Sequence, residues 1–200
     1  MCGRYTLFTD KEYQDIRKII RAVQEKGHEV KTGEIYPTNP APILVWEGKE
    51  TVPQAVKWGW PKFQGSGVLI NARAETAEEK NLFRKSVYTR RCVVPTTGFY
   101  EWDQEKVKYR FILPHASTLY LAGLYNEFQG ERRFLILTTE TNTSVSFIHS
   151  RMPVIIFREM IDTWLEDTEK AVHMLHWQQP ELHIATPVSY THLTLPTTSR

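Results

Sequence analysis

The feature that most constrains the fold is a series of short β-type runs with few helical segments between them. The runs cover residues 43–46, 51–58, 68–71, 92–95, 109–113, 118–124 and 134–139, and several of them are bounded by Gly, Pro or Asn. A parallel α/β sheet would need a helix after almost every strand, and this regular alternation is missing. The sequence therefore predicts an α+β fold, a single domain of mostly antiparallel strands that form a barrel-like sheet core with peripheral helices.

Helical patterns occur near both ends and in the middle of the chain. Thr9 followed by Glu12 forms a capping-box pattern, and apolar residues from Ile16 to Val23 then recur at helical spacing. Further helices are expected at residues 76–88, 158–166 and 168–176. Together these patterns predict one domain over residues 1–188. Residues 189–200 are Thr-rich and fit neither period, so we interpret them as a non-native tail derived from cloning or an adapter.

Composition limits the location and the cofactors. The longest apolar runs, such as residues 43–46 and 154–157, are far too short to cross a bilayer, and no basic leader precedes an apolar segment. We therefore expect a cytoplasmic protein without membrane contact, and a monomer. His173 and His176 lack the further ligands of a metal site, and no Gly-rich phosphate loop is present, so neither metal nor cofactor is expected. The net charge of +2 neither requires nor excludes nucleic acid.

Cys2 is the residue with the most unusual chemistry. Removal of Met1 would leave Cys2 as the N-terminal residue, with an α-amine and a thiol on adjacent carbons. Their ordinary pKa values, about 8 and about 8.5, keep both groups partly available at neutral pH. Such a 1,2-aminothiol forms an imine with an aldehyde and then closes to a thiazolidine. Taken alone, a Cys at position 2 is more often exposed and unused, and a core residue is not expected there.

Three other positions carry groups suited to hydrogen bonding or proton transfer. Asn71 ends a strand-like run, where a polar side chain can face a cleft. Glu101 lies between two aromatic residues, and desolvation there would raise its pKa into the range of a general acid or base. His149 lies on an expected loop just before Arg151, which suits a proton shuttle. Each also has a simpler explanation, as a capping residue, a surface carboxylate and a structural histidine respectively.

The remaining candidates carry groups of the kinds that bind unpaired bases and phosphates. Trp58 lies in a Trp-Gly-Trp run, and aromatic rings of this kind stack on unpaired bases. The arginines at Arg4, Arg73 and Arg151 carry charges that can meet backbone phosphates. The chain has six tryptophans, most of them expected in the core, so Trp58 alone is a modest signal.

These residues fall in six motifs that follow one another along the chain. The motifs are Met1-Cys2-Gly3-Arg4-Tyr5, Trp58-Gly59-Trp60, Asn71-Ala72-Arg73-Ala74-Glu75-Thr76, Gly98-Phe99-Tyr100-Glu101-Trp102, Leu121-Ala122-Gly123-Leu124-Tyr125 and His149-Ser150-Arg151-Met152-Pro153. As an ordered set they are highly specific, and the chain resembles the SRAP family (SOS-response-associated peptidase domain). The resemblance implies antiparallel strands closed around a cleft, and a protein that shields abasic sites in single-stranded DNA.

The resemblance also implies a role for each candidate catalytic residue. Cys2 would attack the aldehyde of a ring-opened abasic site with its α-amine and close the thiazolidine with its thiol. Asn71 would position the N-terminus or the sugar, and Glu101 would shuttle protons. His149 would act as an acid or base on the sugar oxygen or the leaving phosphate.

For binding, the resemblance implies that Arg4, Arg73 and Arg151 hold flanking phosphates, with Trp58 near the splayed strand and no cofactor. Lyase and self-processing peptidase activities belong to the same expectation. Two alternatives stay open. One is a cysteine-type autopeptidase or hydrolase, although only Met1 precedes the thiol here. The other is a module that binds single-stranded or junction DNA without a covalent step.

Overall fold

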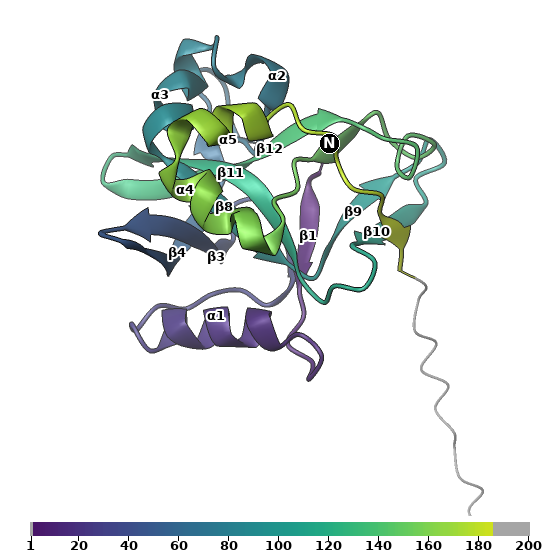
Figure 1. The fold of residues 1–200 in the computed structure, drawn as a ribbon, viewed down its shortest axis with the longest axis horizontal. Coiled ribbons are helices and arrows are strands. Elements are labelled where there is room, and N and C mark those ends of the chain that lie inside the picture. The colour runs from purple at the N-terminus through teal and green to yellow at the C-terminus, as the bar shows by residue number, and fades with distance from the viewer. Residues whose placement is uncertain (1, 186–200) are drawn as a thin grey trace, which may run out of the picture.

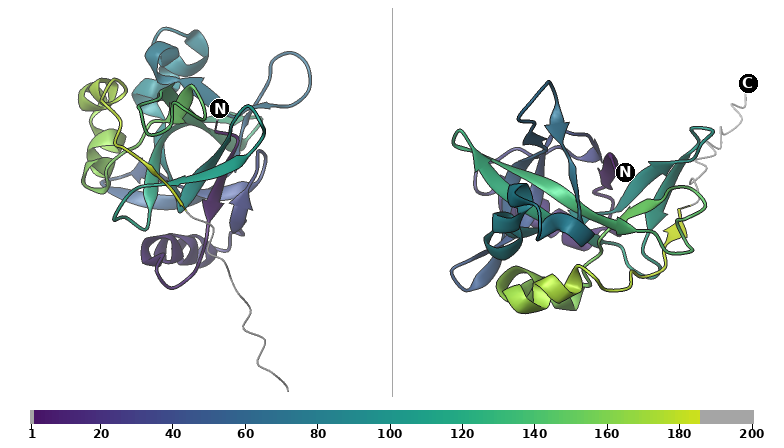
Figure 2. Two further views of the ribbon diagram at one scale, coloured as in Figure 1. Left: turned by 90° about the vertical axis from the view of Figure 1, so that its right-hand side faces the viewer. Right: turned by 90° about the horizontal axis from the view of Figure 1, so that it is seen from above.

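The centre of the fold is a closed ring of five strands in a computed structural model that describes residues 2–185. The ring contains β3 (Pro40–Glu47), β4 (Glu50–Trp58), β8 (Arg91–Thr96), β11 (Leu119–Phe128) and β12 (Glu131–Glu140). It closes because β11 pairs with both β8 and β12, while β12 runs parallel to β4. The left view of Figure 2 shows the strands arranged around a central axis. The predicted α+β single domain with a barrel-like, mostly antiparallel core is confirmed.

A second sheet carries the start of the chain. Its order is β14-β10-β9-β1-β2, and all its pairs are antiparallel. The members are β1 (Arg4–Leu7), β2 (Gly33–Ile35), β9 (Gly98–Trp102), β10 (Lys108–Ile112) and β14 (His183–Ile184). Because β1 lies between β2 and β9, the beginning of the chain is an interior strand rather than a frayed end.

Gly98 joins the two sheets at the corner between β8 and β9. Its φ of +148° favours glycine, and an added Cβ would lie 2.8 Å from the carbonyl oxygen of Phe111. The hydroxyl of Thr6 also reaches this corner, 2.7 Å from the hydroxyl of Thr97. This close packing fixes β9 beside β1.

Successive side chains on the strands of the closed ring point alternately inward and outward, so the buried residues form two cores. On β8, Cys92 and Val94 point into the ring, whereas Val93 points outward to the helices. The inner core also holds Trp58 and Phe134, whose rings stack with centroids 6.3 Å apart. The outer core lies between the ring and the helices of residues 74–89 and 161–174.

The helices lie outside the strands (Figure 1). They are α1 (Gln14–Gln24), α2 (Ala74–Ala77), α3 (Asn81–Thr89), the 3-10 turn η1 (Arg158–Met160), α4 (Ile161–Glu166) and α5 (Thr168–Met174). The shortest strands are β5 (Trp60–Pro61), β6 (Val68–Leu69), β7 (Asn71–Arg73) and β13 (Arg151–Pro153). Within the described residues, no helix is long and apolar enough to span a bilayer.

Two expectations about the helices need correction. The helix after Thr9 exists and buries Ile16, but it begins at Gln14 with Tyr13 as N-cap and without a side-chain cap. The capping-box pattern instead lies in a turn, because the chain must first leave β1. The single helix expected over residues 76–88 is divided into α2 and α3. The proposed tail, residues 189–200, lies outside the described residues.

Candidate functional site

Cys2 lies just before β1, and its side chain is completely buried in the inner core. Its Sγ is 3.8 Å from the carbonyl oxygen of Arg4. Burial raises the pKa of the Cys2 thiol well above its ordinary value, and the charge of Glu101 raises it further. The expectation of an exposed, partly ionised thiol is therefore wrong. The pairing of β1 on both sides draws Cys2 into the core, where the thiol is neutral at pH 7.

Glu101 and His149 form a pair of titratable groups, and Glu101 lies within electrostatic reach of the thiol. Glu101 projects inward from β9 and is only 2% exposed, and burial raises its pKa to about 7. Its Oε2 lies 4.0 Å from Nε2 of His149, which the loop before β13 supplies. The two residues are far apart in the sequence, so this contact depends on how the loop before β13 folds back toward β9. The structure therefore brings Glu101 and His149 together, and Glu101 lies within electrostatic reach of Cys2.

Hydrogen bonds orient the imidazole of His149. The backbone N–H of Arg151 donates to His149 Nδ1 over 3.0 Å, which favours hydrogen on Nε2, the nitrogen that faces Glu101. Burial lowers the pKa of His149, so its neutral form prevails at pH 7. A neutral imidazole beside a carboxyl group of pKa about 7 is an arrangement that can pass protons in either direction.

Asn71 occupies a buried position on β7. Its Nδ2 donates to the carbonyl oxygen of Ile136 over 3.5 Å, and its Oδ1 is buried without a hydrogen-bond partner among the described residues. Strand β12 connects Asn71 with the histidine motif, because Thr138 of β12 lies opposite both Arg73 of β7 and Pro153 of β13. The free Oδ1 is an acceptor that a bound group can use.

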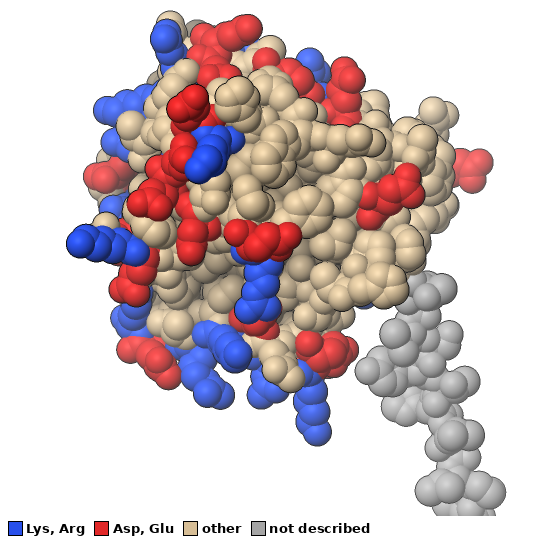
Figure 3. All heavy atoms as spheres, viewed as in Figure 1, with Lys and Arg blue, Asp and Glu red and all other residues tan. Residues whose placement is uncertain are grey.

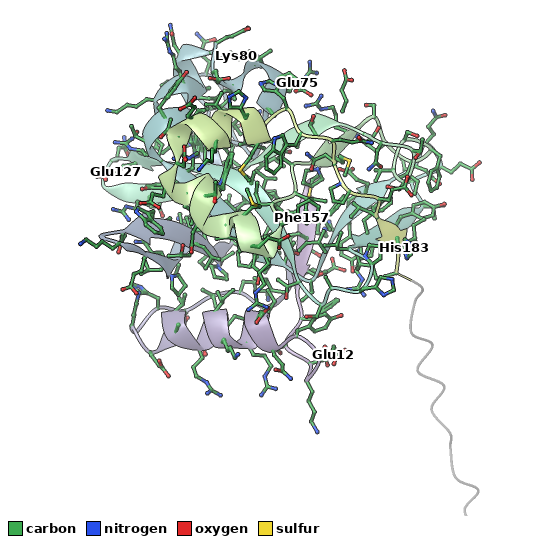
Figure 4. All side chains as sticks on the ribbon, in the orientation of Figure 1. Glu12, Glu75, Lys80, Glu127, Phe157 and His183 are labelled. Carbon is green, nitrogen blue, oxygen red and sulfur yellow. The ribbon has the colours of Figure 1, made fainter. Side chains whose placement is uncertain are left out.

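Arg151 is engaged by a carboxylate instead of being free for phosphate. Its guanidinium donates two hydrogen bonds of 2.8 Å to Glu75, and it also reaches the carbonyl oxygen of Thr138 at 2.6 Å. Although burial opposes the shift, the hydrogen bonds from Arg151 lower the pKa of Glu75 to about 2. Figure 4 shows Glu75 at the α2 end of the molecule. This ion pair fastens α2 to β13 and thereby fixes the backbone that holds His149.

The other predicted DNA-binding residues lie in different surroundings. Arg73 is exposed at the end of β7, as a phosphate contact requires. Arg4 is half-buried, 3.3 Å from Glu34, with its guanidinium 4.2 Å from the centre of the Tyr36 ring. Trp58 is completely buried, and its indole donates to the carbonyl oxygen of Ile70 over 3.2 Å. The expectation that Trp58 lies near the DNA strand is therefore corrected: it is a core residue whose ring has no face for a base.

Two aromatic residues that the sequence did not single out are open to a ligand. Phe63 is 83% exposed on the turn between β5 and β6. Phe147 is 66% exposed and lines a groove with Trp102, His149 and the turn that follows β9. No strand or helix periodicity marks these two residues, because both lie in connections between strands.

Comparisons with known proteins identify relatives of this chain. A family model described as SOS response associated peptidase (SRAP) matches residues 1–191. The abasic site processing protein YoqW of Bacillus subtilis (strain 168) is 35% identical over 185 residues, covering 82% of this chain and 80% of that protein. The abasic site processing protein YoaM of the same organism is 32% identical over 181 residues, covering 82% and 79% respectively.

Solved structures share the fold. A protein from Bordetella bronchiseptica has a TM-score of 0.73 at 22% identity, covering 92% of this chain and 98% of its own. A protein from Bacteroides thetaiotaomicron has a TM-score of 0.71 at 24% identity, covering 93% of each chain. At this identity the likeness concerns the fold alone, whereas the family model spans nearly the whole sequence. The chain therefore belongs to the SOS response associated peptidase (SRAP) family.

Proposed function

We propose that this protein captures abasic sites in single-stranded DNA by forming a thiazolidine with Cys2. The observation that carries the proposal is the arrangement of three groups. The buried Cys2 thiol feels the charge of Glu101, and Glu101 Oε2 lies 4.0 Å from His149 Nε2. A nucleophile is thus combined with a carboxyl group whose pKa is about 7 and with a neutral imidazole. The names of the relatives YoqW and YoaM, both abasic site processing proteins, support the same substrate.

The reaction begins once Met1 has been removed. The α-amine of Cys2 attacks the aldehyde carbon of the ring-opened sugar, and loss of one water gives an imine. The thiol then adds to the imine carbon, its proton passes to the nitrogen, and a five-membered thiazolidine results. No oxidant, metal or cofactor enters this balance.

The remaining residues serve proton transfer and positioning. Because burial keeps the Cys2 thiol protonated, ring closure needs a base, and Glu101 with its pKa of about 7 supplies one. His149 Nε2 donates to the sugar oxygen or the leaving phosphate. The free Oδ1 of Asn71 accepts a hydrogen bond from the amine or from a sugar hydroxyl. Arg4 and Arg73 hold flanking phosphates, while Phe147, which lines the groove with His149, replaces Trp58 as the residue that stacks on a base.

A cysteine peptidase is a poorer explanation for the same residues. Such enzymes lower the pKa of the thiol by pairing it with an imidazolium, so that a thiolate attacks first. Here burial and Glu101 both raise the pKa of the Cys2 thiol, and His149 is neutral. A thiol of this kind suits a reaction in which the amine attacks first and sulfur follows within the same molecule.

The proposal predicts a covalent complex with damaged DNA. Untagged protein, with Met1 removal confirmed by mass, is mixed with a single-stranded oligonucleotide that carries one abasic site and then run on a denaturing gel. We expect a shifted band that survives denaturant, with a mass equal to protein plus DNA minus one water. The intact oligonucleotide is the control and should give no such band. Folded protein that binds DNA but gives no adduct would leave a non-covalent binding module.

Replacing Glu101 by glutamine should slow capture and alter its pH dependence. In the wild type, the ionised fraction of Glu101 grows as the pH rises through about 7, so the capture rate should rise over the same range. The Glu101→Gln variant should capture roughly 100-fold more slowly, as expected for loss of a general base, and should lack the inflection near pH 7. Single-turnover rates from pH 5 to 9 measure both effects. An unchanged inflection would assign it to another group.

The same variant has a stability readout that separates catalysis from misfolding. A carboxyl group whose pKa is about 7 when folded and 4.5 when unfolded favours folding less as the pH rises between those values. The neutral amide of the variant avoids this cost, so Glu101→Gln should be more stable than the wild type at pH 8 by about 3 kcal/mol. At pH 4 the two proteins should have similar melting temperatures. A variant that is slower and yet more stable cannot owe its slowness to unfolding.

A further inference from the structure

The outer face of the β14-β10-β9-β1-β2 sheet carries cations and aromatic rings in alternating positions. Tyr100 of β9 lies opposite Arg4 of β1 on one side and opposite Arg110 of β10 on the other. Two residues along, Trp102 lies opposite Lys108. Residues opposite one another project to the same side of a sheet, so these five side chains share one face, the face away from buried Glu101. We call them the outer-face cluster.

Within the outer-face cluster, charged side chains pack against aromatic rings. The Arg4 guanidinium lies 5.1 Å from the centre of the Trp102 ring, and the Lys108 ammonium lies 3.8 Å from the centre of the Tyr100 ring. The two rings are themselves 6.3 Å apart. None of the five side chains is fully buried, so a ligand can reach them.

The cluster retains positive charge. Glu34 contacts Arg4 at 3.3 Å and Lys108 at 2.5 Å. Arg110 forms no ion pair within the described part of the chain, and its guanidinium instead lies over the ring of Phe8 at 5.1 Å. Three cations against one carboxylate leave an excess of two positive charges, which favours an anionic partner.

The cluster is continuous with the candidate site. Trp102 lines the groove that also contains His149, so the groove and the outer face meet at this residue. Arg4 is only two residues from Cys2, and Trp102 follows Glu101 directly. A chain that leaves the site along the groove would therefore arrive at the outer-face cluster.

We propose that the outer-face cluster binds the single-stranded DNA that flanks the abasic site. This proposal rests on the proposed function for the position of the lesion. Single-stranded DNA presents bases and phosphates in alternation, and a surface of alternating rings and cations matches that order. The rings of Tyr100 and Trp102 stack on bases, while Arg4, Lys108 and Arg110 turn from the rings to the phosphates.

Loss of two of these cations tests the phosphate contacts. Binding of Lys108→Ala/Arg110→Ala is measured by fluorescence anisotropy at several salt concentrations, with intact single strands of about 4 and about 16 nucleotides. For the long strand we expect about tenfold weaker binding and a salt slope lower by about 1.4, or about 0.7 for each lost contact. The short strand, which cannot cover both the site and the outer face, should show a smaller loss. A long-strand affinity and slope equal to those of the wild type would overturn the proposal.

Lys18→Ala/Arg21→Ala is the matched control, because it removes the same charge from exposed positions on α1. Lys and Arg side chains gather along the edge formed by α1, so a general effect of net charge would appear there as well (Figure 3). Equal losses in both double variants would also overturn the proposal. The control should bind both strands as the wild type does.

Tyr100 separates stacking from charge. Tyr100→Ala should weaken binding of the long strand about tenfold with an unchanged salt slope, and Tyr100→Phe should retain wild-type affinity because the ring remains. Covalent capture is scored in parallel. If the cluster variants weaken binding but the wild type forms no adduct, the proposed function is wrong, and the proposal that the outer-face cluster binds single-stranded DNA is supported. If the adduct forms and every variant binds the long strand as the wild type does, the proposed function is supported, and the proposal that the outer-face cluster binds DNA is wrong.

Discussion

Replacing Cys2 by alanine should abolish the denaturant-resistant complex with abasic DNA while leaving the binding of intact DNA nearly unchanged. Binding is expected to persist because phosphate contacts supply most of the affinity for single strands, and Cys2 is completely buried. The α-amine of the Cys2→Ala variant still forms an imine, which reverts in water because no thiol closes the ring. Borohydride reduction should therefore trap an adduct of this variant that does not survive without reductant.

Cys92→Ala is the matched control for this experiment. Cys92 is the other cysteine of the chain, equally buried in the inner core, and its Sγ packs against Gly123. It should leave the adduct yield unchanged at temperatures where the variant is folded. A denaturant-resistant adduct at wild-type yield in Cys2→Ala, without reductant, would sink the mechanism.

Blocking the N-terminus should be as damaging as removing the thiol. An extension ahead of Cys2 converts its amine into an amide, which cannot form an imine, although the thiol remains. We expect no thiazolidine from a protein that keeps Met1 or carries an uncleaved N-terminal tag. Intact-mass measurement of the protein and of the protein–DNA mixture checks this directly.

A cleavable tag provides the control for the extension. When a protease releases the tag so that Cys2 becomes the first residue, the adduct should return to the wild-type yield. This rescue separates the chemical requirement for a free amine from any damage that the tag does to folding. Normal adduct formation by the tagged protein would instead identify a different nucleophile, such as a lysine.

Much of the fold could be predicted because local periodicity reports which face of an element is buried. Short β-type runs without βα alternation predicted the ring, and Ile16 and Val23 marked the buried face of α1. The start of α1 was misplaced because the Thr9–Glu12 pattern is local, whereas the course of the chain out of β1 depends on the whole sheet. Periodicity likewise could not tell that α2 and α3 are separate helices.

The site was harder to predict because burial depends on closure of the barrel. Nothing near Cys2 in the sequence indicates that β1 lies between two partners, and so the thiol was expected at the surface. Trp58 was expected to face DNA for the same reason, although its ring fills the inner core. The pairing of Arg151 with Glu75 was also missed, since the two residues come from distant motifs.

The burial of Cys2 has a consequence for the chemical lifetime of its thiol. Peroxides and other oxidants attack thiolates, and the rate follows the ionised fraction and the access of the oxidant. A thiol that is wholly enclosed and whose pKa is raised well above the ordinary value offers neither. Conditions that damage DNA often oxidise sulfur as well. If Cys2 captures abasic sites as proposed, its burial keeps the sulfur reduced until an aldehyde arrives at the neighbouring amine.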